Sequence, residues 1–139
     1  MALRRDAKIE LLKRVPLFAA CTKGELRRLA SIADELDVRE GTVLIHEGRI
    51  GHEFFVLIAG EVRVSKDGKK LADLGGGDWL GEIALLTKGP RTATATAMSP
   101  VHTLVLVDRD FRGVVKEMPS IAVKVLTCVA TRLTRDARS

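Results

Sequence analysis

The feature that most constrains the fold is a series of short apolar runs with glycine at the joins. The runs lie at residues 36–38, 42–45, 54–58, 61–66, 69–74, 91–97 and 101–107. Asp67-Gly68 stands between two of them and is typical of a hairpin turn in which both central residues need positive φ. In one run, Val62 and Val64 alternate with charged residues, which predicts the inward face. Many short strands joined by tight turns predict an antiparallel sandwich or barrel.

Helical patterns precede these runs. Residues 3–14 form a weakly amphipathic stretch, which Pro16 ends. Thr22-Lys23-Gly24-Glu25 has the spacing of a capping box, in which the threonine hydroxyl and the glutamate carboxylate each accept from the other residue's backbone N–H. We therefore expect a second helix after Thr22, with its apolar side chains on one face.

Helical patterns also follow the runs. Asp108 is suited to cap a helix, and Pro119 separates it from a last helix at about residues 120–135. The first part of that last helix is apolar nearly all round, more than one packing face needs. Four of its residues have the spacing of a helix-pair seam: Val123, Leu126, Ala130 and Leu133. This helix could therefore serve as a lid over a ligand, as a homodimer interface, or as both.

The chain is long enough for one domain. We expect a mainly β fold, an antiparallel β-roll (double-sheet jelly roll) at residues 34–107, between N-terminal helices at 1–33 and two C-terminal helices at 108–139.

Composition predicts a cytoplasmic protein that is not inserted in a membrane. Cys21 and Cys128 are the two cysteines, too few for a disulfide framework, and the reducing cytosol is the default compartment. No apolar run approaches the roughly 20 residues of a membrane-spanning helix. The first six residues lack the apolar core of a signal peptide.

Charge is distributed unevenly. Residues 1–28 carry eight basic and three acidic groups, residues 29–108 carry eight and twelve, and residues 109–139 carry seven and three. Basic terminal helices suit an acidic partner, although a solvated helix face is the plainer interpretation. Because the middle of the chain is acidic, an anion site there must be local rather than a consequence of bulk charge.

The stretch at residues 80–97 has the composition of such a site. Gly81 allows close approach of a ligand to the backbone, and residues 82–86 can form one helical turn whose first N–H groups lack intrahelical partners. Arg91 opens the run at 91–97, and its planar guanidinium can donate paired hydrogen bonds to a phosphate. Glu82 can accept from a sugar hydroxyl. Together these residues predict a site for a nucleotide monophosphate.

This stretch also resembles the phosphate-binding cassette of the cyclic nucleotide-binding domain family, which includes catabolite activator proteins, kinase regulatory subunits and gated channels. The resemblance lies in Gly81-Glu82-Ile83-Ala84-Leu85-Leu86 and in Pro90-Arg91-Thr92-Ala93. Leu80 departs from it, since the family usually has phenylalanine there, and this departure affects packing more than ligand contact.

The resemblance implies a role for each matching position. Glu82 is expected to bind the ribose 2′-hydroxyl, Arg91 the cyclic phosphate, and the backbone of Gly81, Ile83 and Ala84 to complete the cradle. Thr92, with Ala93 beside it, is expected to add a hydroxyl to the phosphate or the purine. The expected ligand is cAMP, with cGMP second.

Taken together, these patterns predict a regulatory domain in signal transduction and not an enzyme, because no catalytic pair is evident. The scattered His46, His52 and His102 do not form a recognised metal site. Trp79 could stack on a base but is more often a core residue.

The few residues after Leu133 are too short for an effector domain, so we expect either a stand-alone receptor or one domain of a longer protein, acting through an unidentified effector protein. Two other functions remain open: a ligand-independent interaction module on the same fold and, less favoured, nucleic-acid binding through the basic terminal helices, which would weaken steeply with salt.

Overall fold

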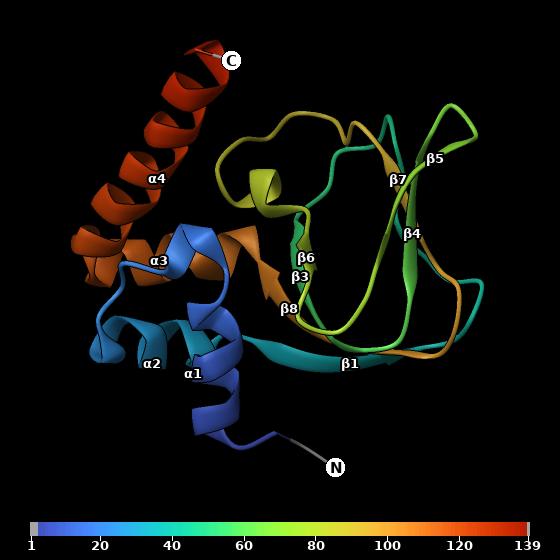
Figure 1. The fold of residues 1–139 in the computed structure, drawn as a ribbon. Coiled ribbons are helices and arrows are strands. Elements are labelled where there is room, and N and C mark those ends of the chain that lie inside the picture. Colours follow the sequence, from blue (N-terminus) through green and yellow to red (C-terminus); the bar gives the residue numbers. More distant parts are fainter. Residues whose placement is uncertain (1–2, 139) are drawn as a thin grey trace.

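A computed structural model of the chain describes residues 3–138, with side chains as far as residue 131. Two four-stranded antiparallel sheets form a β-roll, with strand orders β1-β8-β3-β6 and β2-β7-β4-β5. Helices from both ends of the chain gather on one side of the roll (Figure 1). The expected fold class, a β-roll with N-terminal helices and two C-terminal helices, is therefore confirmed.

The strands are short, as their sequence runs predict. They are β1 (Asp34–Val38), β2 (Val43–Ile45), β3 (Glu53–Ala59), β4 (Val62–Lys66), β5 (Lys69–Leu74), β6 (Trp79–Leu80), β7 (Thr94–Ala97) and β8 (Val101–Val107). The two-residue strand β6 has no periodicity that the sequence could reveal.

The helical elements precede β1, interrupt the roll once and follow β8. They are α1 (Arg5–Lys13), the 3₁₀ helix η1 (Pro16–Phe18), α2 (Lys23–Ser31), the 3₁₀ helix η2 (Glu82–Leu85), α3 (Asp108–Glu117) and α4 (Pro119–Arg138). None of the helices in the described part of the chain combines the length and the hydropathy that crossing a lipid bilayer requires.

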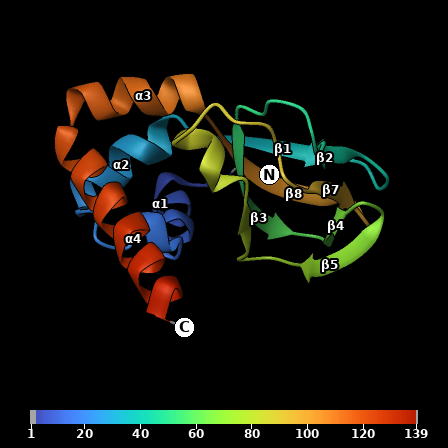
Figure 2. The ribbon, with the colours of Figure 1, turned by 90° about the horizontal axis from the view of Figure 1, so that it is seen from above.

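Strand β3 is buried on both faces, because it separates two hydrophobic cores. Phe54 and Val56 pack with the helices, whereas Phe55 and Leu57 point into the roll. All four side chains are buried. Because successive side chains of a strand point to opposite faces, β3 contributes to both the helical layer and the roll. Figure 2 shows these two layers from above.

Local turn chemistry agrees with the sequence. Asp67 and Gly68 have φ of 52° and 79° between β4 and β5, so the predicted hairpin turn is confirmed. The predicted capping box is confirmed as well, because Thr22 accepts from the backbone N–H of Glu25 and the Glu25 carboxylate accepts from that of Thr22.

Helix α4 packs on the N-terminal helices. Its side chains Ile121 and Val125 are buried in the helical core. Val123 and Leu126, on another face of the helix, are each 63% exposed. The side chain of Leu133, the last residue of the predicted seam, lies outside the described part of the chain.

A buried carboxylate ties α4 to α2. The carboxylate of Glu25 accepts hydrogen bonds from Lys124 and Ser120 of α4 and from the backbone of Thr22. Burial alone raises the pKa of Glu25, but these hydrogen bonds outweigh it and lower the pKa to about 2. Glu25 is therefore ionised at neutral pH and holds the start of α4 against α2.

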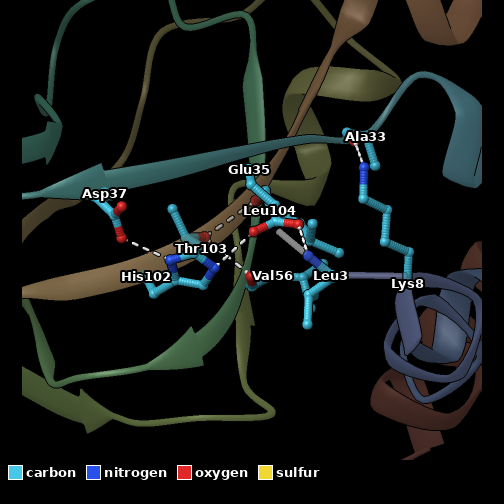
Figure 3. A network of polar contacts seen from close by, with 9 residues as sticks. All are labelled: Leu3, Lys8, Ala33, Glu35, Asp37, Val56, His102, Thr103 and Leu104. Atoms are coloured by element: carbon cyan, nitrogen blue, oxygen red, sulfur yellow. Dashed lines mark hydrogen bonds and ion pairs between the residues drawn. The ribbon is translucent and has the colours of Figure 1, made fainter. Parts of the chain in front are cut away.

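A second polar network joins the segment before α1 to strand β1 (Figure 3). The ring of His102 on β8 lies between two carboxylates of β1, with Nδ1 2.6 Å from Asp37 and Nε2 2.8 Å from Glu35. The other oxygen of Glu35 accepts from the backbone N–H of Leu3. Because both ring nitrogens face ionised acceptors, this geometry favours the imidazolium, which donates from both nitrogens.

These contacts predict a pH-dependent contribution to stability. The hydrogen bond to Asp37 is the largest cause of the raised pKa of His102 in the folded state, and the backbone N–H of Leu3 is the largest cause of the lowered pKa of Glu35. The histidine contribution is complete below its ordinary pKa of 6.5 and is lost as pH rises through the raised value. The glutamate contribution is complete above 4.5 and is lost as pH falls through the lowered value.

We therefore expect His102→Asn to lower the melting temperature most at about pH 5.5, between the two ordinary pKa values, and least at about pH 9. Thermal unfolding of both proteins across this range checks the difference. An equal loss at both pH values would show that His102 contributes through packing alone.

Candidate functional site

The candidate site is a cavity of about 270 Å³ at the mouth of the roll, between η2 and the segment that leads into β7. This volume lies near the lower limit for small-molecule pockets. Its lining is mainly apolar and contains one carboxylate and one cation. The lining residues are Ile45, Val64, Leu80, Gly81, Glu82, Ile83, Ala84, Gly89, Pro90, Arg91, Thr92, Ala93, Thr94 and Ala95.

All seven residues that the sequence singles out line this one cavity. They are Gly81, Glu82, Ile83, Ala84, Arg91, Thr92 and Ala93. Their contact with a ligand stays a prediction. Sequence reasoning missed the apolar wall from neighbouring strands, to which Ile45, Val64 and Ala95 belong. The inward alternation of Val64 was the available signal, but only the pairing of the strands shows which cavity it faces.

Gly81 is the N-cap residue directly before η2 and lies in the left-handed region, with φ of 83°. A Cβ at this position would lie 2.9 Å from the carbonyl oxygen of Glu53 and 2.9 Å from Nη1 of Arg91. Glycine is required here for both reasons, because a side chain would strain the backbone and intrude on its neighbours. The carbonyl of Gly81 accepts from the N–H of Ala84 at 3.1 Å, so part of the predicted backbone cradle also closes the turn itself.

Backbone carbonyls hold the guanidinium of Arg91. Its Nη2 donates to the carbonyl of Glu53 at 2.5 Å and its Nη1 to the carbonyl of Gly81 at 3.3 Å. One carbonyl belongs to β3 and the other to the residue directly before η2. The guanidinium therefore links the turn to the sheet, and within the described part of the chain two backbone carbonyls orient it.

The charge of Arg91 is only partly compensated. Burial lowers the pKa of its guanidinium, and the more distant carboxylates of Glu53, Asp108 and Glu82 oppose this effect. None of the ion pairs between residues that the structure describes includes Arg91. A half-buried arginine stays protonated, so an anion that enters the cavity would gain a charge-assisted hydrogen bond.

One expected strand is shorter than predicted, because residues 91–93 lie outside β7, which begins at Thr94. The backbone N–H of Arg91 donates to the carbonyl of Arg49 at 2.8 Å, and the carbonyl of Arg91 accepts from Gly48 at 2.8 Å. These bonds direct the segment toward the connection between β2 and β3. Residues 91–93 thus line the cavity and do not belong to strand β7.

Asp108 links the neighbourhood of Arg91 to the C-terminal helices. Its buried carboxylate lies 3.0 Å from Nδ1 of His52, and its backbone N–H donates to the carbonyl of His52 at 2.8 Å. Asp108, predicted as the N-cap, is instead the first residue of α3, and Val107 holds the N-cap position. Burial raises the pKa of this carboxyl, but the hydrogen bonds from His52 and from the backbone of Arg109, together with the charges of His52 and Arg112, outweigh burial and keep the pKa below its usual range.

Other candidates lie elsewhere. Trp79 packs against the helical core and is not among the lining residues of the cavity. Among the residues that the structure describes, no group of three or more histidine, cysteine, aspartate or glutamate side chains is arranged to hold a metal ion. Within that same part of the chain, α4 contributes no residue to the lining of the cavity.

Three comparisons relate this arrangement to known proteins. Residues 35–118 match the family model described as cyclic nucleotide-binding domain. The chain is 34% identical to the N-terminal domain of a transcriptional regulator from Streptomyces coelicolor A3(2), whose structure superposes with a TM-score of 0.84 over 93% of this chain and 96% of that one.

Two curated relatives are longer proteins. The CRP-like cAMP-activated global transcriptional regulator of Mycobacterium tuberculosis (strain ATCC 25618 / H37Rv) is 30% identical over 132 residues, which are 91% of this chain and 58% of that protein. The cAMP-dependent protein kinase regulatory subunit of Hypocrea atroviridis is 32% identical over 109 residues, which are 78% of this chain and 24% of that protein. The chain therefore spans no more than 58% of either relative.

The geometry of Gly81 predicts a cost for any side chain there. We expect Gly81→Ala to lower the free energy of unfolding by about 1 to 2 kcal/mol, because alanine must adopt positive φ and its Cβ would crowd the Glu53 carbonyl. Urea denaturation of both proteins measures the difference. Gly113→Ala, at a helical position where a Cβ would meet nothing within 4 Å, is the control and should not destabilise. Equal stability of Gly81→Ala and the wild type would contradict the assigned turn.

Proposed function

The chain belongs to the cyclic nucleotide-binding domain family, and from this premise we propose that it is a sensor of a 3′,5′-cyclic nucleotide, with cAMP preferred over cGMP. The observation that carries the proposal is Arg91, a half-buried cation that backbone carbonyls orient at the edge of a mainly apolar cavity. The names of the two curated relatives associate those proteins with cAMP, which supports the choice of base.

The proposed ligand contacts follow from the chemistry of the lining. The guanidinium of Arg91 has donors left over after its two carbonyl contacts, and these bind the cyclic phosphate. The carboxylate of Glu82 accepts from the ribose 2′-hydroxyl, and Thr92 offers a hydroxyl near the phosphate or the purine. Apolar side chains such as Val64 and Ile45 pack on the sugar and base.

The lining favours binding over catalysis. Among the cavity residues that the structure describes, Glu82 and Arg91 are the only ionisable side chains, and there is no histidine, cysteine or lysine. General acid–base or nucleophilic chemistry usually relies on a base such as histidine or on an activated thiol or amine, and the described lining offers none of these beside Glu82 and Arg91. We therefore propose a regulatory domain without enzymatic activity, which acts on an effector protein.

Signalling is proposed to use α4. Residues Met118 and Pro119 join α3 to α4 and form a hinge about which α4 can close toward the cavity. Exposed apolar side chains lie on both elements, Ile83 on η2 and Val123 and Leu126 on α4, and closure would remove some of this surface from water. A second copy of the chain is the other partner that could cover α4. Ligand then shifts an open and closed equilibrium by no more than its differential affinity for the two states.

Calorimetric titration of the purified chain with cAMP, cGMP and 5′-AMP at fixed salt tests the proposal. We expect micromolar or tighter binding of a cyclic nucleotide and much weaker binding of 5′-AMP. Absence of heat with all three ligands would exclude the sensor function and favour the ligand-independent interaction module on the same fold.

Substitution of the arginine tests the phosphate contact. We expect Arg91→Ala to weaken cyclic nucleotide binding by about 10-fold to 100-fold, because a charge-assisted hydrogen bond contributes about 1.5 to 3 kcal/mol. Calorimetry gives the affinity, and thermal unfolding controls for the fold. Unchanged affinity in a folded variant would remove Arg91 from the site.

Substitution of the glutamate tests the ribose contact. We expect Glu82→Gln to weaken binding less than Arg91→Ala does, because the amide oxygen still accepts from a hydroxyl. The same titration measures both variants. A greater loss at Glu82 than at Arg91 would mean that the two assigned roles are reversed.

A further inference from the structure

Gly51 lies directly against the guanidinium of Arg91, although the two residues are 40 positions apart in the sequence. A Cβ built on Gly51 would lie 1.8 Å from Nε of Arg91, 2.4 Å from Cζ and 2.6 Å from Nη2. These three atoms are its nearest neighbours, and all belong to the arginine side chain. Any side chain at position 51 would therefore occupy the space that the guanidinium now fills.

The loop that carries Gly51 cannot simply move aside. Backbone pairing joins it to the segment that carries the arginine. The N–H of Arg91 donates to Arg49, the N–H of Gly48 donates to Arg91, and Ile50 forms an isolated antiparallel bridge with Pro90. Because the two backbones are in register, a clash at position 51 would be relieved by the arginine side chain.

The backbone of Gly51 itself does not require glycine. Its φ lies outside the left-handed region, in contrast to Gly48 and Gly81, with φ of 83° each. No left-handed φ therefore opposes alanine at this position. The need for glycine at this position thus comes from the neighbouring guanidinium rather than from the turn.

We infer that Gly51 is a positioning residue for the anion site, and that the missing side chain is what lets Arg91 reach the carbonyls of Glu53 and Gly81. This inference rests on the proposed cyclic nucleotide function. With a methyl group at position 51, Arg91 leaves both carbonyls and its guanidinium no longer faces the phosphate. Gly51 acts only through Arg91 and makes no contact with the ligand.

The test compares four proteins by calorimetric titration with cAMP: the wild type, Gly51→Ala, Arg91→Ala and the double variant. We expect Gly51→Ala to weaken binding by about 10-fold to 100-fold, like loss of the arginine contact. In the Arg91→Ala background the same change should alter affinity less than about 2-fold, because interacting residues are not additive. Gly113→Ala is the matched control and should bind as the wild type does.

Thermal unfolding separates positioning from folding. Gly51→Ala and Arg91→Ala remove the same two carbonyl contacts, so the melting temperature of Gly51→Ala should fall no further than that of Arg91→Ala. Wild-type affinity in Gly51→Ala would overturn the inference. An equal loss of affinity in the Arg91→Ala background would also overturn it, because Gly51 would then act without the arginine.

A crystal structure of ligand-free Gly51→Ala distinguishes failure of the inference from failure of the proposed function. If the wild type binds no cyclic nucleotide, the sensor proposal fails. The position of Arg91 in the crystal structure of Gly51→Ala then tests the positioning role by itself. A guanidinium displaced from Glu53 and Gly81 supports the positioning role. A guanidinium that still donates to both carbonyls beside the new methyl group refutes it.

Discussion

The cavity depends on one interaction, the half-buried guanidinium of Arg91 between backbone carbonyls of β3 and η2. Buried cations in proteins are usually paired with a carboxylate, and a carboxylate in contact with the guanidinium would compete with an incoming anion. Carbonyl oxygens orient the donors and leave the positive charge in place. Gly81 and Gly51 both lack a side chain where a Cβ would crowd the guanidinium, so they leave space for it.

Helix α2 contacts both sides of the junction between α3 and α4. Arg28 donates to Glu117, the last residue of α3, at 2.7 and 2.8 Å, and one turn earlier Glu25 accepts from Lys124 of α4. The first pair is exposed and contributes little, whereas the second is buried and costly to break. A movement of α4 about Pro119 that separates Glu25 from its partners carries this cost, which the ligand's differential affinity for the closed state must overcome.

Much of the fold follows from local patterns. The Asp67-Gly68 turn, the capping box at Thr22 and most strands appear where the sequence predicts them, because each depends on neighbours only a few residues apart. Strand β6 was missed because two residues carry no period. The strand predicted from residue 91 begins at Thr94, because the backbone of Arg91 pairs with the connection between β2 and β3.

For the site, the sequence alone singled out seven of the residues that line the cavity, with Gly81, Glu82 and Arg91 among them, since all seven belong to one short segment. The tertiary structure decided how that chemistry is held. Gly51 lies in the connection before β3, and the carbonyl of Glu53 belongs to β3, both far from Arg91 in the sequence. Neither a glycine nor a backbone carbonyl indicates in the sequence which residue it will contact. Only packing brings them to the guanidinium, because side-chain excluded volume acts between neighbours in space, however far apart they lie along the chain.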